Sequence, residues 1–221
     1  MTIRTVAGLS LAHDLPEGGM AYIDRDWLPQ DGEAPHVSIL ALAPDGRLRW
    51  PGGRWIPAPK DLSADQAAAA MFNALARTAV LALPGEGLVA VPGTGIVAVR
   101  IRQLIGDRLA RAGGAPALAA VDTTGRADRI AEATEAVVDM GTVVLAMSGE
   151  AASIPIDLYS EVHKRGVRLV GVAFPEQGAA TGTPLPRPAT MGGEGEPNAG
   201  AWFVARPAAS QPSASSPAAD S

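Results

Sequence analysis

The sequence predicts an α/β fold in which a parallel sheet with covering helices follows a small β-rich N-terminal module. From Leu88 onward, apolar strand-like runs alternate with helix-like segments, which is typical of a parallel sheet. Before that point, turn-forming residues divide short apolar pieces, which favours a small β module. With 221 residues and 47% hydrophobic content, the chain can bury one sizeable core, or a core plus a small satellite domain.

Composition excludes several classes of function. The formal net charge is -5 and no run of Lys or Arg occurs, so we expect no nucleic-acid partner. The chain has no cysteine, which excludes disulfides, thiolate nucleophiles and Cys-ligated zinc. Residues 1–11 lack the apolar run of a signal peptide, and no apolar stretch reaches the roughly 20 residues of a membrane span. We therefore expect a cytoplasmic protein without membrane contact.

Residues 1–60 form the predicted β-rich module. Clusters of Pro, Gly and Asp mark its turns, and the apolar pieces between them predict short strands at residues 20–23, 37–43 and 54–56. A helix is then predicted over residues 67–83. This segment is rich in Ala, and Ser63 with Gln66 matches the capping-box pattern before it.

Residues 61–206 form the predicted parallel-sheet domain. Strands are predicted at residues 88–91, 117–121, 142–146 and 167–174, with a last edge strand at 201–205. The helices are predicted at residues 96–111, 127–138 and 157–165. Residues 176–200 are dense in Gly and Pro, as in lids and linkers. The tail 207–221 is rich in Pro, Ala and Ser and is predicted to be disordered.

The strongest local motif is a strand, the loop Gly93-Thr94-Gly95-Ile96 and a helix, with Ala98 completing the pattern Gly-x-Gly-x-x-Ala. In a dinucleotide-binding fold, the first Gly allows a tight turn and the second lets the backbone approach a pyrophosphate. The small third residue lets the helix and strand pack closely. The phosphates meet free N–H groups at the positive end of the helix. Alternatively, the two glycines only make a tight strand-to-helix turn, and the sequence leaves both interpretations open.

Five segments, in the same order, resemble the medium-chain dehydrogenase/reductase family, which includes alcohol dehydrogenases and quinone reductases. They are residues 56–68 continuing to 77–79, the loop 93–95, the strand end 121–125, the strand 141–145, and the segment 156–166 continuing to 169–171. The resemblance covers about residues 54–174. It implies an abridged Rossmann-like sheet, a truncated GroES-like N-terminal module, and a homodimer formed through edge strands.

The resemblance also implies a site and a small-molecule substrate. NAD(P)H would lie on Gly93, Thr94, Gly95 and Ile96, with Thr123 beside it and its nicotinamide near Thr124, Met147 and Ser148. Ligands of parallel sheets bind at the carboxyl ends of the strands, where Asp122, Thr123 and Thr124 are predicted to lie. Asp122 and Thr124 are therefore the candidate catalytic residues.

The chain departs from the family in three respects. The family's zinc sites need Cys and His ligands, whereas this chain has no Cys and 3 His, so we expect no zinc. The N-terminal module is also about half the family's usual length. A full nucleotide-binding domain of this type has six strands, and residues 88–174 have room for about four.

Asp122 has two interpretations within this shortened domain. If residues 117–122 are the second strand, Asp122 is the acidic residue that binds the ribose hydroxyls. If they are the fourth strand, the second and third strands have been deleted. We prefer the deletion, because Asp-Thr-Thr-Gly, the following helix and residues 141–145 match the later part of the family pattern. The deletion removes much of the adenosine-binding wall and argues against ordinary NAD(P) binding. Whether Asp122 serves a site or caps the next helix stays open.

Three functions compete. The resemblance implies a zinc-independent reductase that uses NAD(P)H on a small carbonyl or enone. The second function is a scaffold that has lost the cofactor and catalyses a cyclisation, dehydration or isomerisation in natural-product biosynthesis. Asp122 would act there as acid or base, because an apolar site raises the pKa of a carboxyl toward working pH. The third function is a non-catalytic partner subunit, which needs a large apolar surface.

Overall fold

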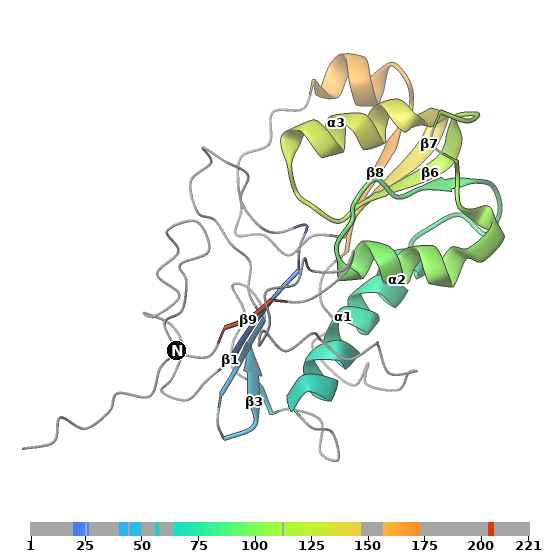
Figure 1. Cartoon of the computed structure of the whole chain (residues 1–221). Helices are drawn as coiled ribbons and strands as arrows, with labels where there is room; N and C mark the ends of the chain where they lie inside the picture. The colour runs from blue at the N-terminus through green and yellow to red at the C-terminus, as the bar shows by residue number, and fades with distance from the viewer. Residues whose placement is uncertain are drawn as a thin grey trace, which may run out of the picture.

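The computed structural model describes residues 20–24, 26, 40–43, 45–49, 56–57, 64–111, 113–146, 157–172 and 203–205. In this part of the chain, a small antiparallel sheet and a parallel sheet lie on either side of helix α1 (Ala64–Leu81) (Figure 1). The helix begins before the predicted residue 67 and ends before the predicted residue 83. Leu48 of the small sheet shares one apolar core with α1 and with the parallel sheet.

The small sheet contains β1 (Met20–Ile23), β2 (Leu40–Leu42), β3 (Arg47–Arg49), β4 (Ile56–Pro57) and β9 (Phe203–Ala205), in the order β4-β3-β2-β1-β9. Each neighbouring pair is antiparallel. Strand β3 is not predicted by the sequence pattern. It follows a tight turn in which the N–H of Gly46, at φ 77°, donates to the carbonyl of Ala43 at 3.0 Å.

The sheet to which strand β9 belongs differs from the one in the predicted domain division. That division assigns residues 201–205 to the parallel-sheet domain, whereas β9 pairs with β1 of the small sheet. Strand pairing across about 180 residues leaves no signal in local sequence patterns. The predicted likeness of the N-terminal module to GroES stays a prediction, and the tail 207–221 lies outside the described residues.

The predicted parallel sheet is confirmed. It contains β5 (Val89–Ala90), β6 (Ala117–Asp122), β7 (Val137–Leu145) and β8 (Arg168–Gly171), in the order β5-β6-β7-β8, and every pair is parallel. Val89 pairs with Ala119, and Asp122 pairs with Leu145. The carboxyl ends of β5 and β6 therefore lie at one edge of the sheet, next to the start of helix α2 (Ile96–Ile105).

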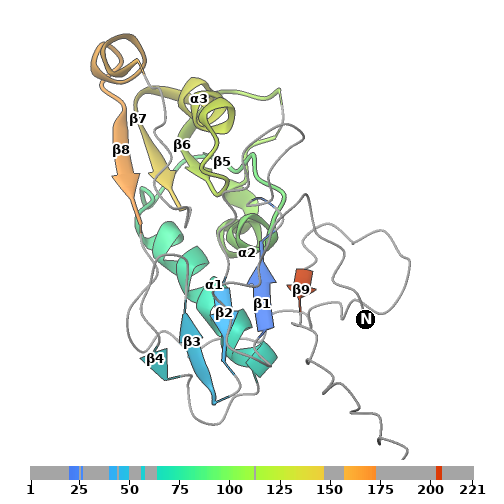
Figure 2. The ribbon, with the colours of Figure 1, turned by 90° about the vertical axis from the view of Figure 1, so that its left-hand side faces the viewer.

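Helices cover both faces of this sheet (Figure 2). On one face, α1 and α2 pack on alternate residues of β6, including Ala119 and Val121. On the other face, Ala133 of α3 (Ala127–Ala136) packs with Ala120. Helix α2 ends earlier than predicted because Gly106, at φ 55°, leaves the helical conformation. The predicted third helix of this domain is the short π-helix η5 (Leu158–His163), capped by Asp157.

The chain after α2 returns to the outer edge of β5. The carbonyl of Val89 accepts from the N–H of Ala110 at 2.9 Å, while the carbonyl of Leu88 accepts from Leu118 at 2.9 Å. Successive carbonyls of a strand point to opposite sides. The contact at Ala110 therefore lies on the side of β5 away from β6, and the chain then crosses to form β6.

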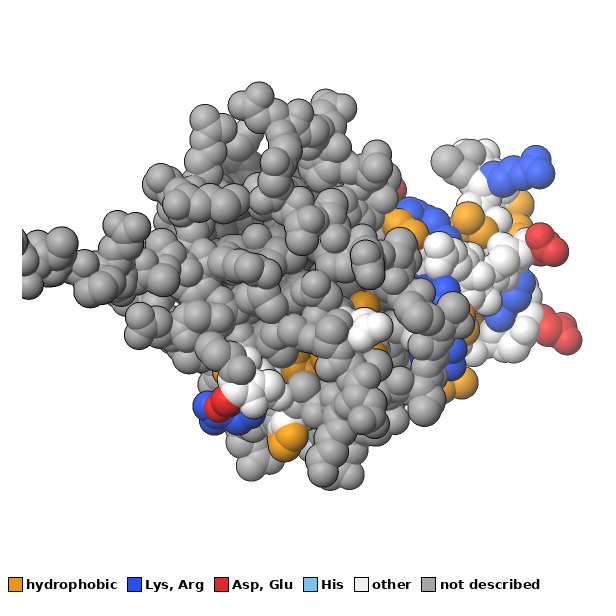
Figure 3. All heavy atoms as spheres, turned by 60° about the horizontal axis from the view of Figure 1, so that its bottom comes forward, with side chains coloured by type: hydrophobic (Ala, Val, Ile, Leu, Met, Phe, Trp, Pro, Cys, Tyr) orange, Lys and Arg blue, Asp and Glu red, His pale blue; other side chains and the backbone are white. Residues whose placement is uncertain are grey.

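Two surface properties bear on partners. None of the helices in the described ranges combines the length and apolar character of a membrane span. Basic and acidic side chains both lie along one margin of the face shown in Figure 3. The predicted absence of nucleic-acid and membrane partners, and the predicted homodimer, stay predictions.

Candidate functional site

The glycine loop lies between β5 and α2, as the sequence predicts. Gly95 is the N-cap of α2 and has no side chain to bond the first N–H groups of the helix. Those groups have no partner within a helix, so another group has to accept from them. Two carboxylates from the segment after β1, Asp24 and Asp26, lie at this point, and sequence reasoning does not identify either of them.

Asp24 caps α2 from the small sheet. Its Oδ2 accepts from the N–H of Val97 at 2.9 Å, and its Oδ1 accepts from the N–H of Asp26 at 2.9 Å. The side chain is fully buried. Burial raises the pKa of Asp24 to about 7, and the neighbouring Asp26 carboxylate adds to the rise. Hydrogen bonds from the backbone of Val97, Asp26 and Ile96 oppose it.

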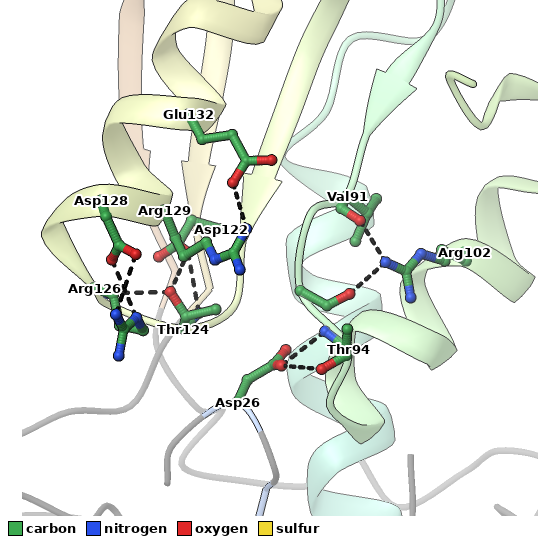
Figure 4. A network of polar contacts seen from close by, with 11 residues as sticks. Asp26, Val91, Thr94, Arg102, Asp122, Thr124, Arg126, Asp128, Arg129 and Glu132 are labelled. Atoms are coloured by element: carbon green, nitrogen blue, oxygen red, sulfur yellow. Dashed lines mark hydrogen bonds and ion pairs between the residues drawn. The ribbon is translucent and has the colours of Figure 1, made fainter. Parts of the chain in front are cut away.

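Asp26 connects the glycine loop to the end of β6. Its Oδ1 accepts from the N–H of Thr94 at 2.7 Å and from the Thr94 hydroxyl at 3.1 Å (Figure 4). Its Oδ2 accepts from the hydroxyl of Thr123 at 2.6 Å. Asp26 is 9% exposed, and its partner Thr94 is exposed. Of the two carboxylates, Asp26 is the one nearer to solvent.

The two glycines provide the space that these carboxylates occupy. A Cβ on Gly95 would lie 1.5 Å from Oδ1 of Asp24. A Cβ on Gly93 would lie 2.3 Å from Oδ2 of Asp26 and 2.1 Å from Oγ1 of Thr123. A close approach at these glycines therefore exists, but the approaching groups are carboxyl groups of the same chain, and the predicted approach of a pyrophosphate stays a prediction. Arg102 fixes the loop from the other side, because its guanidinium donates to the carbonyls of Val91 and Gly93.

Asp122 has the contacts of a capping residue. It is buried at the end of β6, and its carboxylate accepts from the N–H of Thr124 at 3.1 Å, the Thr124 hydroxyl at 2.8 Å and the N–H of Gly125 at 2.9 Å. These bonds order the loop that leads into α3. Burial raises the pKa of Asp122, and the hydrogen bonds from Thr124 and Gly125 oppose the rise. The capping interpretation describes these contacts, and a catalytic role stays a prediction.

The predicted site residues form two neighbouring groups. The first group surrounds the Asp24–Asp26 pair, because each member belongs to the start of α2 or contacts Asp26. Its members are Gly93, Thr94, Gly95, Ile96 and Thr123. Asp122 and Thr124 lie in the adjoining loop, and the Asp26 charge acts on Asp122. Met147 and Ser148 lie outside the described residues. The missed residues have one local signal, which is that two acids follow directly on a predicted strand.

The residues at this loop do not fit a dinucleotide bound in the usual way. A pyrophosphate would need the N–H groups that face the helix start, and those of Thr94 and Val97 already donate to Asp26 and Asp24. A phosphate there would also meet the Asp26 charge, and like charges repel at short range. Within the described residues, no group of three His, Asp or Glu side chains is arranged to hold a metal ion.

No protein-family model and no curated protein sequence matches this chain. Solved structures similar to it are medium-chain dehydrogenases. TarJ from S. aureus is 12% identical over 67% of this chain and 60% of that chain, with a TM-score of 0.44. L-idonate 5-dehydrogenase from Escherichia coli is 13% identical over 74% of this chain and 78% of that chain, with a TM-score of 0.43.

A third similar structure is 2R,3R-butanediol dehydrogenase from Bacillus subtilis, 13% identical over 72% of this chain and 78% of that chain, with a TM-score of 0.41. One TarJ structure is a complex with NADPH. This chain thus spans 60% of the length of TarJ. Likeness at this level concerns the fold and assigns no substrate or metal.

Proposed function

We propose that this chain is a dehydrogenase-like scaffold that catalyses a non-redox, acid–base step on a small molecule and binds no dinucleotide at its glycine loop. The step would be an isomerisation, a dehydration or a cyclisation. The observation that carries the proposal is the position of Asp24 and Asp26, whose carboxylates accept from the N–H groups of Val97 and Thr94. A pyrophosphate would need the same groups.

The three carboxyl groups near the start of α2, those of Asp24, Asp26 and Asp122, support acid–base catalysis. The Asp26 charge acts on two further carboxyls, those of Asp24 and Asp122, and both have raised pKa values. The carboxyl of Asp24, whose pKa is raised to about 7, can both donate and accept a proton near working pH. Asp26 is the group of the three nearest to solvent, beside the exposed Thr94. We assign Asp26 as the residue that exchanges a proton with the substrate, and Asp24 as the buried carboxyl that holds a proton beside it.

The sheet supports the loss of the adenosine-binding wall. In a six-strand dinucleotide-binding sheet, the second strand lies beside the first on the side away from the fourth. Here β6 lies on one side of β5, and the bridge between Val89 and Leu109 lies on the other. We interpret this bridge as what is left of the second strand. The deletion of the second and third strands stays a prediction, which the strand order β5-β6-β7-β8 supports.

The second candidate function is the zinc-independent reductase implied by the resemblance, which would use NAD(P)H on a small carbonyl or enone. One observation favours it. The strand, glycine loop and helix have the close packing that the motif needs, with the Cβ of Ala98 3.2 Å from where a Gly93 side chain would begin. This function requires Asp24 and Asp26 to leave the helix start before the cofactor binds.

Solvent deuterium exchange tests the proposal without knowledge of the natural substrate. The full chain is incubated in D2O, without cofactor, with a panel of hydroxy-ketones and enones, and NMR follows deuterium entering carbon next to the carbonyl. We expect exchange that Asp26→Asn lowers by about 100-fold or more. Asp107→Asn, a change of an exposed acid, is the control and should exchange like the wild type. Exchange that is equal in Asp26→Asn, or turnover that requires NAD(P)H, contradicts the proposal.

A further inference from the structure

We propose that Asp24 and Asp26 form a latch that fastens the end of β1 to the N-terminus of α2, and that this latch has to release before another anion can reach those N–H groups. Asp24 and Asp26 follow a strand of the small antiparallel sheet. Their partners Thr94, Val97 and Thr123 belong to the parallel-sheet domain, 68 to 97 residues later. The latch is therefore a connection between the two sheets.

The contacts make the latch act as one unit. Asp26 bonds the glycine loop with one oxygen and Thr123, at the end of β6, with the other. Asp24 bonds the first turn of α2 and also accepts from the backbone N–H of Asp26. Because the Asp24 side chain is bonded to the backbone of Asp26, displacement of Asp24 also disturbs the segment that positions Asp26. An anion that bound at Val97 would thus have to move the whole segment.

The charges make the latch sensitive to pH. Other charged groups that act on Asp26 are Asp122 from β6, Arg102 from α2 and Arg129 from α3. Within the described part of the chain, no cation forms an ion pair with Asp24 or Asp26. Burial and the Asp26 charge raise the pKa of Asp24 from 3.8 to about 7, so the closed latch holds a proton that the open segment releases. Raising the pH through this window therefore favours the open segment.

Amide hydrogen exchange of the full chain tests the latch directly. Protection factors are measured for the N–H groups of Thr94 and Val97 between about pH 4 and about pH 8, in the wild type, Asp24→Asn and Asp107→Asn. We expect wild-type protection to fall with pH by up to about a thousandfold, which corresponds to the rise in pKa from 3.8 to about 7. Asp24→Asn should show no such fall, and Asp107→Asn should follow the wild type. A flat wild-type profile, or an equal slope in Asp24→Asn, overturns the latch.

A second measurement uses inorganic pyrophosphate as the probe, by calorimetry at about pH 6. Asp24→Ala should bind pyrophosphate at least about tenfold more tightly than the wild type, because it frees the N–H of Val97 and removes the side chain that covers it. Equal affinities overturn the latch. The test is independent of the proposed function, which fails if the reaction needs NAD(P)H. The latch fails if either the protection factors or the pyrophosphate affinities do not depend on Asp24.

Discussion

The carboxylate of Asp24 caps helix α2 through the N–H of Val97, at 2.9 Å, although 73 residues separate them in the sequence. The N-cap residue itself, Gly95, has no side chain to do so. In dinucleotide-binding folds a pyrophosphate meets these N–H groups. Here the chain supplies a carboxyl group of its own, and the same bond connects the small sheet to the parallel sheet.

Gly95→Ala should destabilise the protein by about 2 kcal/mol or more, because the new Cβ would overlap Oδ1 of Asp24, 1.5 Å away, and displace a buried, bonded carboxylate. Urea unfolding measures the effect, and Gly85→Ala is the matched control because nothing lies within 4 Å of its added Cβ. The cost of Gly95→Ala should shrink by about 1 kcal/mol or more in an Asp24→Ala background. Additive costs would show that the glycine and the carboxylate are independent.

Thr123→Val should lower the free energy of unfolding by about 1 to 3 kcal/mol, because it removes the hydroxyl that donates to Oδ2 of Asp26 at 2.6 Å inside the protein. Thr123→Ser keeps the hydroxyl and should recover most of that loss. Chemical denaturation of the three proteins at one pH makes the comparison. If Thr123→Val is as stable as the wild type, the hydrogen bond to Asp26 contributes nothing to stability.

The stability of the protein should fall as the pH rises from about 4 to about 7 through the contribution of Asp24. Its folded-state pKa is about 7 against 3.8 for the ordinary group, so between these values the folded state binds more protons than the unfolded state. The contribution is at most about 4 kcal/mol. Thermal unfolding across this range, in the wild type and Asp24→Asn, isolates it as the difference between the two slopes. Parallel curves for the two proteins would contradict the assignment.

Arg165→Ala should destabilise the parallel-sheet domain by about 1 to 3 kcal/mol. The guanidinium of Arg165 donates to Asp139 at 3.0 Å, to the carbonyl of Thr134 at 2.7 Å and to the carbonyl of Val137, and so joins the end of η5 to the start of β7. The stability of Arg165→Lys should lie between those of the wild type and Arg165→Ala. The lysine ammonium keeps the charge but lacks the planar guanidinium that bonds several acceptors at once. Arg111→Ala, a change of an exposed arginine at the end of another loop, should be close to neutral in the same unfolding assay.

The parallel sheet was predictable because each of its strands has a local apolar pattern. The apolar runs of β6 and β7 and the Gly93–Gly95 turn each carry their own signal, and the structure confirms a parallel sheet of these strands. Boundaries were less predictable. The helix predicted to reach residue 111 ends at Ile105, because Gly106 adopts a positive φ that periodicity does not reveal.

The candidate site was only partly predictable from the sequence. The glycine motif predicts a bound pyrophosphate at Gly93 and Gly95, which stays a prediction, whereas the groups that lie against these glycines are the side chains of Asp24 and Asp26. The identity of these groups depends on how the small sheet docks on the parallel sheet, and no local pattern around Asp24 or Asp26 encodes that contact. For the same reason, the pairing of β9 with β1 could not be foreseen.

The central claim is that the start of α2 is filled by Asp24 and Asp26 and takes no dinucleotide. A calorimetric titration of the purified wild-type protein with NADH and NADPH tests it most directly. We predict no binding of either up to about millimolar concentration, which corresponds to a binding free energy weaker than about -4 kcal/mol. Micromolar binding of either cofactor would contradict the claim and make the reductase the better assignment.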